Sequence, residues 1–437
     1  MSLKLYNSSY KLGEICLQIT DGKHGDCENQ ENSGYYFVSV KDIDDGEINY
    51  SNARQITKFD FEDTDRRTKL ENEDILITNS GTIGKFVFVN SPLSRKTTFQ
   101  KSVAIIKPNK NKIIPKFLYY YLISEKRQLV EYAGGTTQKN LLLRDIRNFE
   151  VKIPDESRQK KIIMILNDID QLISVNKKLN KNLDELCHSL FKYYFIDFIP
   201  FCDDDFIDSD IGEIPKEWSI TTVGNILDCK LGGTPSRSNE SYWGGSIAWI
   251  NSGKVNDFRI IEPSEYITEK GLKKSATKLL PAKTTVIAIT GATLGQISLL
   301  EIDSCANQSV IGIIPNINYP YEFVYPLISS ILIDLLKHQT GGAQQHINKN
   351  NVESFKIICP PAEIISEYKT IVSPIYSKIS DNCFEIEKLQ KLRDTLLPKL
   401  MSGEIDVSKI NCDLELKYNY MKYLFNQIHT PMSKSVV

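Results

Sequence analysis

Residues 75–89 read ILITNSGTIGKFVFV, and a run with the same pattern, VIAITGATLGQISLL, occupies residues 286–300. Each run has two segments rich in β-branched and apolar residues around a turn that contains glycine, which predicts a β-hairpin. Gly84 of the first run falls on Gly295 of the second. Two hairpins of one design indicate that the chain contains a structural unit twice.

Other segments repeat in the same order when the sequence is shifted by about 206 to 212 residues. The paired segments are KLGEICLQITDGKH with TVGNILDCKLGGTP, YFVSVKDI with AWINSGKV, QKSVAIIKP with QSVIGIIPN, and KFLYYYLIS with EFVYPLISS. In the first pair Gly22 is aligned with Gly233, and each copy closes with Gly-Gly-x-x-Gln, at residues 134–138 and 341–345. Because the matches are collinear, we interpret them as an internal duplication that gives two β-rich domains.

Each copy is followed by apolar residues at a period of 3.5, which predicts a coiled-coil helix. A helix of about 40 residues spans about 60 Å, the length of a spacer. Lys378 and Glu385 break the second pattern, where Ile379 and Ile386 can carry the apolar face. The predicted seam residues are Ile165, Ile169, Leu172, Asn176, Leu179, Leu183, Leu186, Leu190 and Tyr193 in the first helix, and Ile371, Ile375, Asn382, Leu389, Leu392 and Leu396 in the second.

Two copies related by a pseudo-twofold axis would place these helices antiparallel within one chain. Asn176 and Asn382 lie near the middle of their helices, and we expect them to meet across the seam and to fix its register. The alternative is that each amide faces solvent. Pro374 removes one backbone hydrogen bond, so we expect it to interrupt or kink the second helix.

The composition is that of a protein with more than one domain. A chain of 437 residues with 41% hydrophobic residues is long enough for two or three domains. Nine scattered cysteines without a C-x-x-C pair indicate neither a disulfide framework nor a zinc cluster. We find no export signal and no run of about 18 apolar residues. We therefore expect a soluble, cytoplasmic protein without membrane contact.

The charge is distributed unevenly although the formal net charge is only −2. Residues 1–74 hold 9 basic and 16 acidic side chains, whereas residues 75–150 hold 13 basic and 4 acidic ones. Such a basic region is either ordinary variation within a domain or a surface that binds phosphate.

The sequence lacks the motifs of an enzyme. SGTIGKF resembles a phosphate loop, but Phe86 stands where Ser or Thr is required and Asn79 where the first glycine belongs. The five histidines share no i, i+4 spacing, so no metal site is predicted. The Asn/Asp-Pro-Pro-aromatic motif of methyltransferases is also missing. We expect a recognition protein without catalytic residues or a cofactor of its own.

The chain resembles the DNA-specificity subunits of type I restriction–modification systems over about residues 10–405. The resemblance rests on GEIPKEW, LGGTPSRSNESYWGGSIAWINSGKV, LFKYYFIDFIP and LLPKLMSGEI, which lie in and around the second copy and after each predicted long helix. It implies an α+β fold with two pseudo-twofold-related β-rich target-recognition domains, separated by two long helices that form an antiparallel coiled coil. Pro374 and the tail from Asp406 to Val437 depart from the family pattern.

The resemblance also implies a division of labour. Each target-recognition domain would read one half of a split site in double-stranded DNA, and the helices would act as a ruler. Two methyltransferase subunits would dock on the helices, and endonuclease or translocase subunits would join them. S-adenosylmethionine, ATP and Mg²⁺ are expected on these partners. The expected segments are the first target-recognition domain (1–154), the first long helix (155–200), the linker and second domain (201–360), the second long helix (361–403) and a C-terminal extension (404–437).

The Gly-Gly loops suggest how DNA is contacted. Small residues let the backbone approach phosphate, and an amide side chain can bind adenine. Because the loop occurs in both copies, we favour a positioning or loop-stabilising role over base reading. Specificity is expected where the copies diverge, with Arg237 to guanine as the sharpest guess. The candidate DNA-binding residues are Lys23, His24, Lys41, Arg95, Lys96, Lys101, Gln138, Lys139, Asn140, Thr234, Ser236, Arg237, Asn251, Lys254, Gln344, Gln345 and His346.

Three of these candidates, Arg95, Lys96 and Lys101, form a basic cluster that would contact phosphates, with Lys107, Lys110 and Lys112 beside it. For Lys107–Lys112 a solvated turn is the alternative. For the whole chain, the main alternative is a coiled-coil scaffold with two protein-binding modules and no DNA contact. A chain that itself transfers methyl groups is a third hypothesis.

Overall fold

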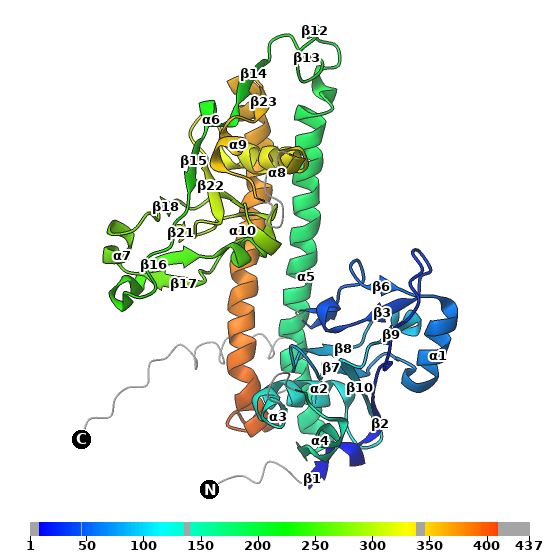
Figure 1. The fold of residues 1–437 in the computed structure, drawn as a ribbon. Coiled ribbons are helices and arrows are strands. Elements are labelled where there is room, and N and C mark those ends of the chain that lie inside the picture. Colours follow the sequence, from blue (N-terminus) through cyan, green and yellow to red (C-terminus); the bar gives the residue numbers. More distant parts are fainter. Residues whose placement is uncertain (1–7, 45, 135–139, 338–345, 410–437) are drawn as a thin grey trace, which may run out of the picture. The chain divides into compact units, whose positions relative to one another are not determined.

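The structure, a computed structural model, describes residues 8–44, 46–134, 140–337 and 346–409. The chain divides into two compact units (Figure 1). The first unit comprises Met1–Gln171 and Leu389–Val437, and the second unit comprises Leu172–Lys388. Each unit combines a β-rich domain with part of the two long helices α5 (Glu156–Phe195) and α10 (Ala362–Ser402). The α+β class with two β-rich domains and two long helices is confirmed.

The β-rich part of the first unit is built on two sheets. An antiparallel sheet has the strand order β2-β10-β7-β8, and a smaller sheet has the order β6-β3-β9, in which β3 and β9 run parallel. Strands β7 and β8 form the hairpin predicted at residues 75–89. Strand β1 pairs with β11, and β4 with β5. The elements are β1 (Ser8–Lys11), β2 (Cys16–Asp21), β3 (Tyr36–Val38), β4 (Ile43–Asp44), β5 (Glu47–Ile48), β6 (Arg54–Gln55), α1 (Lys58–Thr68), β7 (Ile75–Thr78), β8 (Phe86–Phe88), β9 (Thr97–Phe99), β10 (Val103–Pro108), α2 (Pro115–Ser124), α3 (Lys126–Glu131), α4 (Leu143–Asn148) and β11 (Glu150–Ile153).

The second unit repeats this plan. Its antiparallel sheet has the order β15-β22-β19-β20, and its other sheet has the order β17-β16-β21-β18, with β16 and β21 parallel. Strands β19 and β20 form the hairpin predicted at residues 286–300, and β14 pairs with β23. The elements are β12 (Phe206–Ile207), β13 (Ile214–Pro215), β14 (Ser219–Thr222), α6 (Val223–Ile226), β15 (Asp228–Leu231), β16 (Trp243–Ile250), β17 (Glu265–Ile267), α7 (Glu269–Lys273), β18 (Leu279–Leu280), β19 (Thr285–Ala288), β20 (Ile297–Leu299), β21 (Ser304–Ala306), β22 (Val310–Ile314), α8 (Tyr321–Lys337), α9 (Lys349–Glu353) and β23 (Lys356–Cys359).

The two units repeat individual backbone hydrogen bonds as well as strand order. The amide of Gly22 donates to the carbonyl of Val103 at 3.2 Å, and that of Gly232 to Val310 at 3.0 Å. A Cβ atom at Gly22 would lie 2.0 Å from a carbonyl oxygen of the neighbouring turn, and one at Gly232 would lie 2.1 Å from such an oxygen. Only glycine allows this close approach. The structure thus matches Gly22 with Gly232, whereas the sequence comparison aligned it with Gly233.

Both long helices begin directly after the last strand of a β-rich domain. The side chain of Asp155 accepts a hydrogen bond from the Arg158 amide at 3.0 Å, which caps the first turn of α5. Helix α10 follows Pro361 and ends before Gly403, whose φ is +77°. It is continuous through Pro374, so the expected interruption is wrong. Pro374 is exposed, and water can hydrate the carbonyl that it leaves unpaired.

Within the second unit, α5 and α10 run antiparallel. The side-chain amide of Asn180 donates to the carbonyl of Ile379 at 3.3 Å, and further along α5 the carbonyl of Cys187 accepts from the Tyr368 hydroxyl at 3.4 Å. The apolar core of this unit extends from the sheet to both helix segments. Its buried members on the helices are Cys187, Phe191, Phe195, Ile365, Tyr368, Val372 and Tyr376.

Within the first unit, the beginning of α5 meets the end of α10. Arg393 donates to the carboxylate of Asp170 at 3.1 Å, and the ammonium of Lys161 donates to the carbonyl of Ser408 at 2.8 Å. The Tyr120 hydroxyl of α2 donates to the other oxygen of Asp170 at 2.7 Å. Asp170 therefore joins both helix segments of this unit to its β-rich domain.

The contact face of α5 differs from the predicted seam by one residue from the middle of the helix onwards. Ile165 and Ile169 are buried, but Leu172, Leu179 and Leu186 are exposed. The buried positions there are Ile173, Asn180, Cys187, Phe191 and Phe195. In α10, Leu396 is buried and Ile371 is exposed, whereas Val372, Tyr376 and Ile379 are buried. The half-buried predicted positions are Leu183, Leu190, Ile375, Leu389 and Leu392, and Tyr193 is exposed. The prediction followed the leucines of α5. It therefore missed the buried face, which includes Asn180 and Cys187.

The expected pairing of Asn176 with Asn382 is wrong, because Asn382 pairs with Asn180. The amide nitrogen of Asn382 donates to the side-chain oxygen of Asn180 at 2.8 Å, and both residues are buried. The amide nitrogen of Asn180 also lies 3.3 Å from the sulfur of Cys383. Asn176 is partly exposed. Asn180 lies four residues, about one helical turn, after Asn176 and directly follows the predicted seam residue Leu179.

Candidate nucleic-acid interface

In the first unit, the segments that follow β2, β3 and β9 meet where the parallel strands β3 and β9 end. The amide of Gln100, which follows β9, donates to the carbonyl of Val38 at 2.9 Å. The amide of Lys101 donates to the carbonyl of Lys23, which follows β2, at 3.1 Å. The short 3₁₀ helix η2 (Val40–Asp42) continues from β3 at the same place. We call this edge the first rim.

The hairpin loop and the Gly-Gly loop adjoin this rim. The amide of Asn79, at the end of β7, donates to the carbonyl of Ser102 at 3.0 Å, and its own carbonyl accepts from the Leu141 amide at 2.8 Å. Asn140 and Gly134 exchange backbone hydrogen bonds of 2.9 and 3.2 Å, and Asn140 forms a bridge with Ser80. The predicted residue Asn140 thus forms the stem of the loop.

The first rim carries lysines in two electrostatic states. Lys41 and Lys101 are exposed and form no ion pair with any residue that the structure describes. The ammonium of Lys23 lies 2.7 Å from Asp60 and 3.5 Å from Asp63. The hydrogen bond to Asp60 raises the pKa of Lys23, and the same bond lowers the pKa of Asp60. Among the described residues of this rim, Lys41 and Lys101 are therefore positive charges without an ion-pair partner.

His24, beside Lys23, is largely exposed, and its Nε2 lies 2.9 Å from the carboxylate of Asp21. This contact fixes one ring nitrogen, and the imidazole ring stays exposed at the first rim.

The second unit has an equivalent second rim. The amide of Asn307, which follows β21, donates to the carbonyl of Ile250 at 2.9 Å. The Ile289 amide, at the end of β19, donates to the carbonyl of Ser309 at 2.9 Å. The carbonyl of Ile289 accepts from the Ile347 amide at 3.1 Å, and His346 forms a bridge with Thr290. The 3₁₀ helix η6 (Ser252–Asn256) takes the place of η2.

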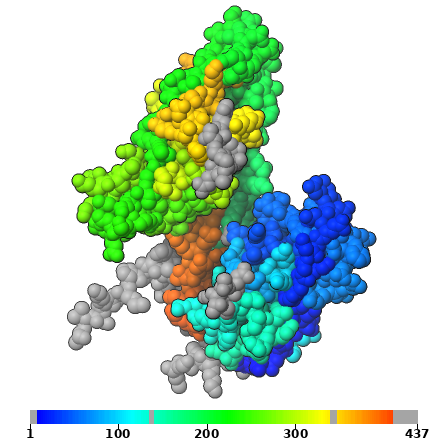
Figure 2. All heavy atoms as spheres, in the orientation of Figure 1, coloured from blue at the N-terminus to red at the C-terminus, as the bar shows by residue number. Residues whose placement is uncertain are grey.

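The side chains of the second rim are mostly neutral or paired. The hydroxyl of Thr234 donates to Gln308 at 2.6 Å. The side chain of Asn251 caps η6 by accepting from the Lys254 amide at 3.2 Å. The ammonium of Lys254 lies 2.8 Å from Asp257. His346 is exposed at the loop stem. Figure 2 shows that segments far apart in sequence adjoin on the surface of each unit, with blue beside cyan atoms in the first unit and green beside yellow atoms in the second.

Arg237 stands in a separate cluster beyond the second rim. Its two Nη atoms donate to the two carboxylate oxygens of Glu265 at 2.6 and 2.7 Å. Its guanidinium carbon lies 3.6 Å from the ring centroid of Trp243. The Trp243 indole donates to the carbonyl of Ser236 at 3.2 Å, and the Ser236 hydroxyl lies 2.8 Å from that of Ser238.

The structure does not bring the predicted basic cluster together. Arg95 and Lys96 lie in η3 (Ser94–Lys96), before β9, whereas Lys101 follows β9. A strand of three residues separates them by roughly 10 Å. Arg95 pairs with Glu71 at 2.9 Å, while the exposed Lys96 forms no ion pair among the described residues.

Of the lysines that follow in the sequence, Lys107 is turned towards the protein, whereas Lys110 and Lys112 are exposed and bind neighbouring groups at the surface. Lys107 lies 2.6 Å from the buried carboxylate of Asp74, Lys110 pairs with Glu73, and the ammonium of Lys112 donates to the carbonyl of Glu14 at 2.7 Å. These contacts contradict a phosphate-binding role for Lys107 and also the alternative of a solvated side chain there. Gln138, Lys139, Gln344 and Gln345 lie outside the described residues.

Three residues of these sites were not predicted. Glu265 and Trp243 hold Arg237, and Gln308 holds Thr234. Glu265 is 28 residues away from Arg237 and Gln308 is 74 residues away from Thr234. No sequence pattern links positions so far apart, and only the pairing of β16 with β17 and β21 brings them together.

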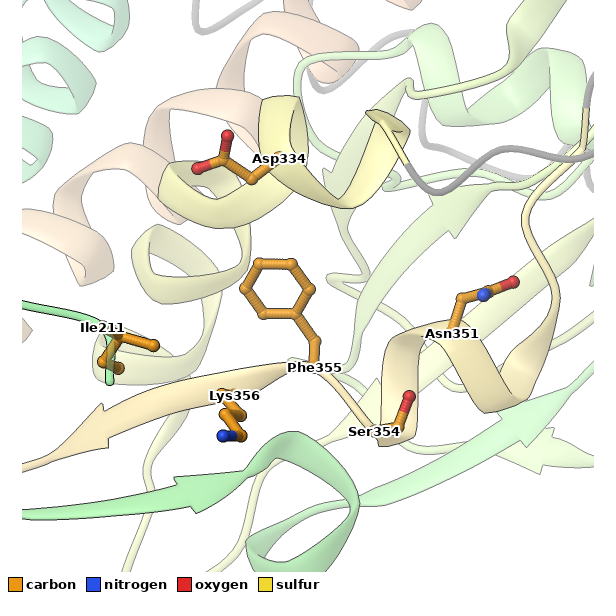
Figure 3. Close-up of a pocket in the computed structure, with 6 residues that line it drawn as sticks. All are labelled: Ile211, Asp334, Asn351, Ser354, Phe355 and Lys356. Carbon is orange, nitrogen blue, oxygen red and sulfur yellow. The ribbon is translucent and has the colours of Figure 1, made fainter. Parts of the chain in front are cut away.

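A cavity of about 440 Å³ lies elsewhere in the second unit (Figure 3). Phe355 stands in its middle, between Asp334 of α8 and the start of β23. Lys356 forms an ion pair with Asp210. The cavity is lined by Ile211, Asp334, Asn351, Ser354, Phe355 and Lys356. None of these residues is a predicted DNA contact, and their arrangement indicates no chemistry.

The described part of the chain was also searched for metal-binding groups and membrane helices. It contains no cluster of three or more His, Cys, Asp or Glu side chains placed to hold a metal ion. None of its helices is both long enough and apolar enough to span a membrane. Its eight described cysteines have free thiols.

Comparisons with known proteins point in one direction. A family model described as "Type I restriction modification DNA specificity domain" matches residues 7–185 and 215–394. The type I restriction enzyme MjaIX specificity subunit of Methanocaldococcus jannaschii is 28% identical over 343 residues, which cover 77% of this chain and 78% of that protein. The HindI specificity subunit of Haemophilus influenzae is 25% identical, over 74% of this chain and 84% of that protein. A crystal structure of a type I S subunit from M. genitalium has a similar fold, with a TM-score of 0.53 and 16% identity over 92% of this chain and 97% of that one.

Proposed function

The chain belongs to the type I restriction modification DNA specificity family, and from this premise we propose that its two rims each read one half of a split target in double-stranded DNA. One observation carries the proposal: the rims share a backbone scaffold but differ in side chains. A shared scaffold places each domain on a duplex in the same way, while different side chains give each domain its own sequence. Residues 1–154 and 201–360 are the proposed reading segments.

The charges suggest which residues hold the backbone of the DNA. Lys41 and Lys101 have no ion-pair partner among the residues that the structure describes, so they are the proposed phosphate contacts on the first rim. Lys254 is neutralised by Asp257 and contributes less. Thr234, Asn251 and the two loop stems offer hydrogen-bonding groups to bases and sugars.

The long helices are the proposed spacer. Each contains about 40 residues. In each unit, both helices contribute buried side chains, so they are fixed by packing and are not flexible linkers. A helix of that length spans about 60 Å. The gap between the two half-sites would then be a property of α5 and α10.

The exposed apolar residues of α5 support a docking role for the spacer. Leu172, Val175, Leu179, Leu186 and Tyr193 are exposed in the second unit and follow one another at steps of three, four and seven residues. These steps place them on one face of the helix. The proposed occupant is an amphipathic helix of a methyltransferase subunit, and two such subunits would join the complex. Endonuclease or translocase subunits would join as well. S-adenosylmethionine, ATP and Mg²⁺ belong to these partners, and the chain acts without catalysis in the cytoplasm.

The test is selection from a library of random DNA duplexes by the full chain, alone and together with its methyltransferase. We expect a selected sequence with two short specified blocks separated by a fixed gap. Replacing Leu179 by Glu should abolish co-purification of the methyltransferase but leave the fold intact by circular dichroism. Recovery of duplexes without any shared sequence, with or without the partner, would refute the proposal.

A further inference from the structure

Arg237 is an exposed side chain that is nevertheless held in one orientation. About half of its side-chain surface is exposed, at 53%. One face of the guanidinium lies on Trp243, and its end donates to both oxygens of Glu265. A free arginine side chain has large rotamer entropy, and contacts of this kind remove it before any ligand binds. The cluster is therefore preorganised.

The loop that carries Arg237 is fixed as well. The Trp249 indole donates to the carbonyl of Gly233 at 3.1 Å, and the Trp243 indole donates to that of Ser236 at 3.2 Å. The rings of Trp243 and Trp249 meet edge to face at 5.2 Å. The same loop begins at the second rim, where Thr234 binds Gln308. Arg237 thus stands at a fixed offset from the rim that we propose to face DNA.

The charge of this cluster argues against a phosphate contact. The hydrogen bond from Arg237 lowers the pKa of Glu265, so the carboxylate is ionised at neutral pH. The pair has no net charge. Phosphate binding draws its free energy from the release of counterions by uncompensated cations, and a neutral pair gains little from it. A carboxylate directed at a phosphate would also be repelled.

The hydrogen bonds leave donors that suit a base. A guanidinium has five N–H donors, and the end-on contact with Glu265 uses one from each Nη. The Nε–H has no acceptor among the described residues, and with the adjacent outer Nη–H it forms a second fork on the side of the group. Bidentate donation to O6 and N7 is how arginine selects guanine in the major groove.

We propose that Glu265 is a positioning residue, which turns the free edge of Arg237 towards a guanine in the half-site of the second domain. This inference rests on the proposed function. Glu265 touches no base itself. It sets the direction of Arg237 and cancels the charge that would otherwise draw Arg237 to phosphates.

The test compares Glu265→Gln with the wild-type full chain in its methyltransferase complex. Affinities for the selected duplex and for duplexes with single-base changes are measured over a range of salt concentrations. In the variant, discrimination at one guanine should fall about 5- to 10-fold, because a bidentate contact supplies up to about 100-fold. The slope of log affinity against log salt should become steeper by about 0.9. The reason is that the guanidinium of Arg237, no longer neutralised by a carboxylate, can bind one more phosphate. Arg237→Ala should lose the same discrimination without making the slope shallower.

Glu269→Gln is the matched control, because Glu269 pairs with Lys273 on the surface of α7 and loses the same charge. It should leave base discrimination unchanged. If Glu265→Gln keeps full discrimination, or if Arg237→Ala weakens all duplexes equally and flattens the slope, the inference is wrong although the proposed function stands. If the wild-type complex selects no sequence at all, the proposed function itself fails.

Discussion

The first and second rims share a backbone and differ in chemistry. Both are built from the ends of two parallel strands, a hairpin loop and the stem of a Gly-Gly loop. The first rim presents Lys41 and Lys101, which have no ion-pair partner in the described part of the chain, whereas the second presents Thr234, Asn251 and a lysine neutralised by Asp257. Groups that hold the scaffold are repeated, and groups that face outwards are not. A duplicated protein can thus keep one way of approaching a ligand while its halves recognise different features.

The comparison extends to the arginine side chains that hold α5 in each unit, one from the β-rich domain and one from α10. In the second unit, Arg259 is buried and donates to Asp184 of α5 at 2.7 Å and to the Tyr325 hydroxyl at 3.3 Å. Replacing it with Ala should lower the free energy of unfolding by about 3–5 kcal/mol, because Asp184 loses its buried partner. Urea unfolding followed by tryptophan fluorescence measures this loss, since Trp218, Trp243 and Trp249 all lie in the second unit.

The matching variant of the first unit is Arg393→Ala. Arg393 pairs with Asp170, and both side chains retain more than a fifth of their exposure. We expect a loss of about 1 kcal/mol or less, measured by circular dichroism. Equal losses in the two variants would show that the exposed pair holds α5 as strongly as the buried one.

The shared scaffold is tested by Gly22→Ala and Gly232→Ala. Each new Cβ would lie about 2 Å from a backbone oxygen, so a strand must move. We expect each variant to lose about 3 kcal/mol of stability, the upper range for overpacking. Thermal unfolding of both variants is the measurement, and a large loss in only one of them would break the equivalence of the rims.

The buried polar pair lies in the second unit. Asn180→Leu should lower stability by about 2 kcal/mol, because Asn382 stays buried without its partner. Replacing both asparagines with leucine should recover that loss but weaken the single register of the helices. Chemical denaturation gives the first effect and methyltransferase binding the second. Asn176→Leu, at a partly exposed position, is the control and should change stability by less than about 0.5 kcal/mol.

The smallest expected effect separates the lysines of the two rims. Lys101→Ala should weaken binding to every duplex by about 1 kcal/mol or less and should flatten the salt slope by about 0.9. Lys254→Ala should change the slope less, because Asp257 already neutralises that charge. Affinity measured at several salt concentrations distinguishes them. Identical slopes for the two variants would mean that the Lys254–Asp257 pair of the free protein does not persist on DNA.

The fold was predictable because local sequence patterns indicate its hairpins and its long helices. The glycine turns at Gly84 and Gly295 and the long heptad stretches each need only a short window of sequence. Because each pattern occurs twice in the same order, the duplication could be recognised as well. The register of the helices was missed by one residue because Asn180 and Cys187 take seam positions that apolar periodicity does not mark.

The site was only partly predictable for a different reason. Whether a lysine is free depends on acids that are distant in sequence, such as Asp60 for Lys23 and Asp74 for Lys107. Sequence clustering placed Arg95 beside Lys101, although β9 keeps them apart. Residue type identified candidates, and tertiary pairing decided which of them carry net charge.

The pairing of β1 with β11 and of β14 with β23 has a consequence for how such proteins change. Ser8 lies opposite Ile153, and Ser219 lies opposite Cys359, so each β-rich domain leaves the chain and rejoins it at neighbouring points. The following helices start within three residues of those points. A segment whose ends are adjacent can be replaced by another while the long helices α5 and α10 keep their structure. Each β-rich domain is therefore an exchangeable segment. Recombination between relatives would give this chain a new target in a single step.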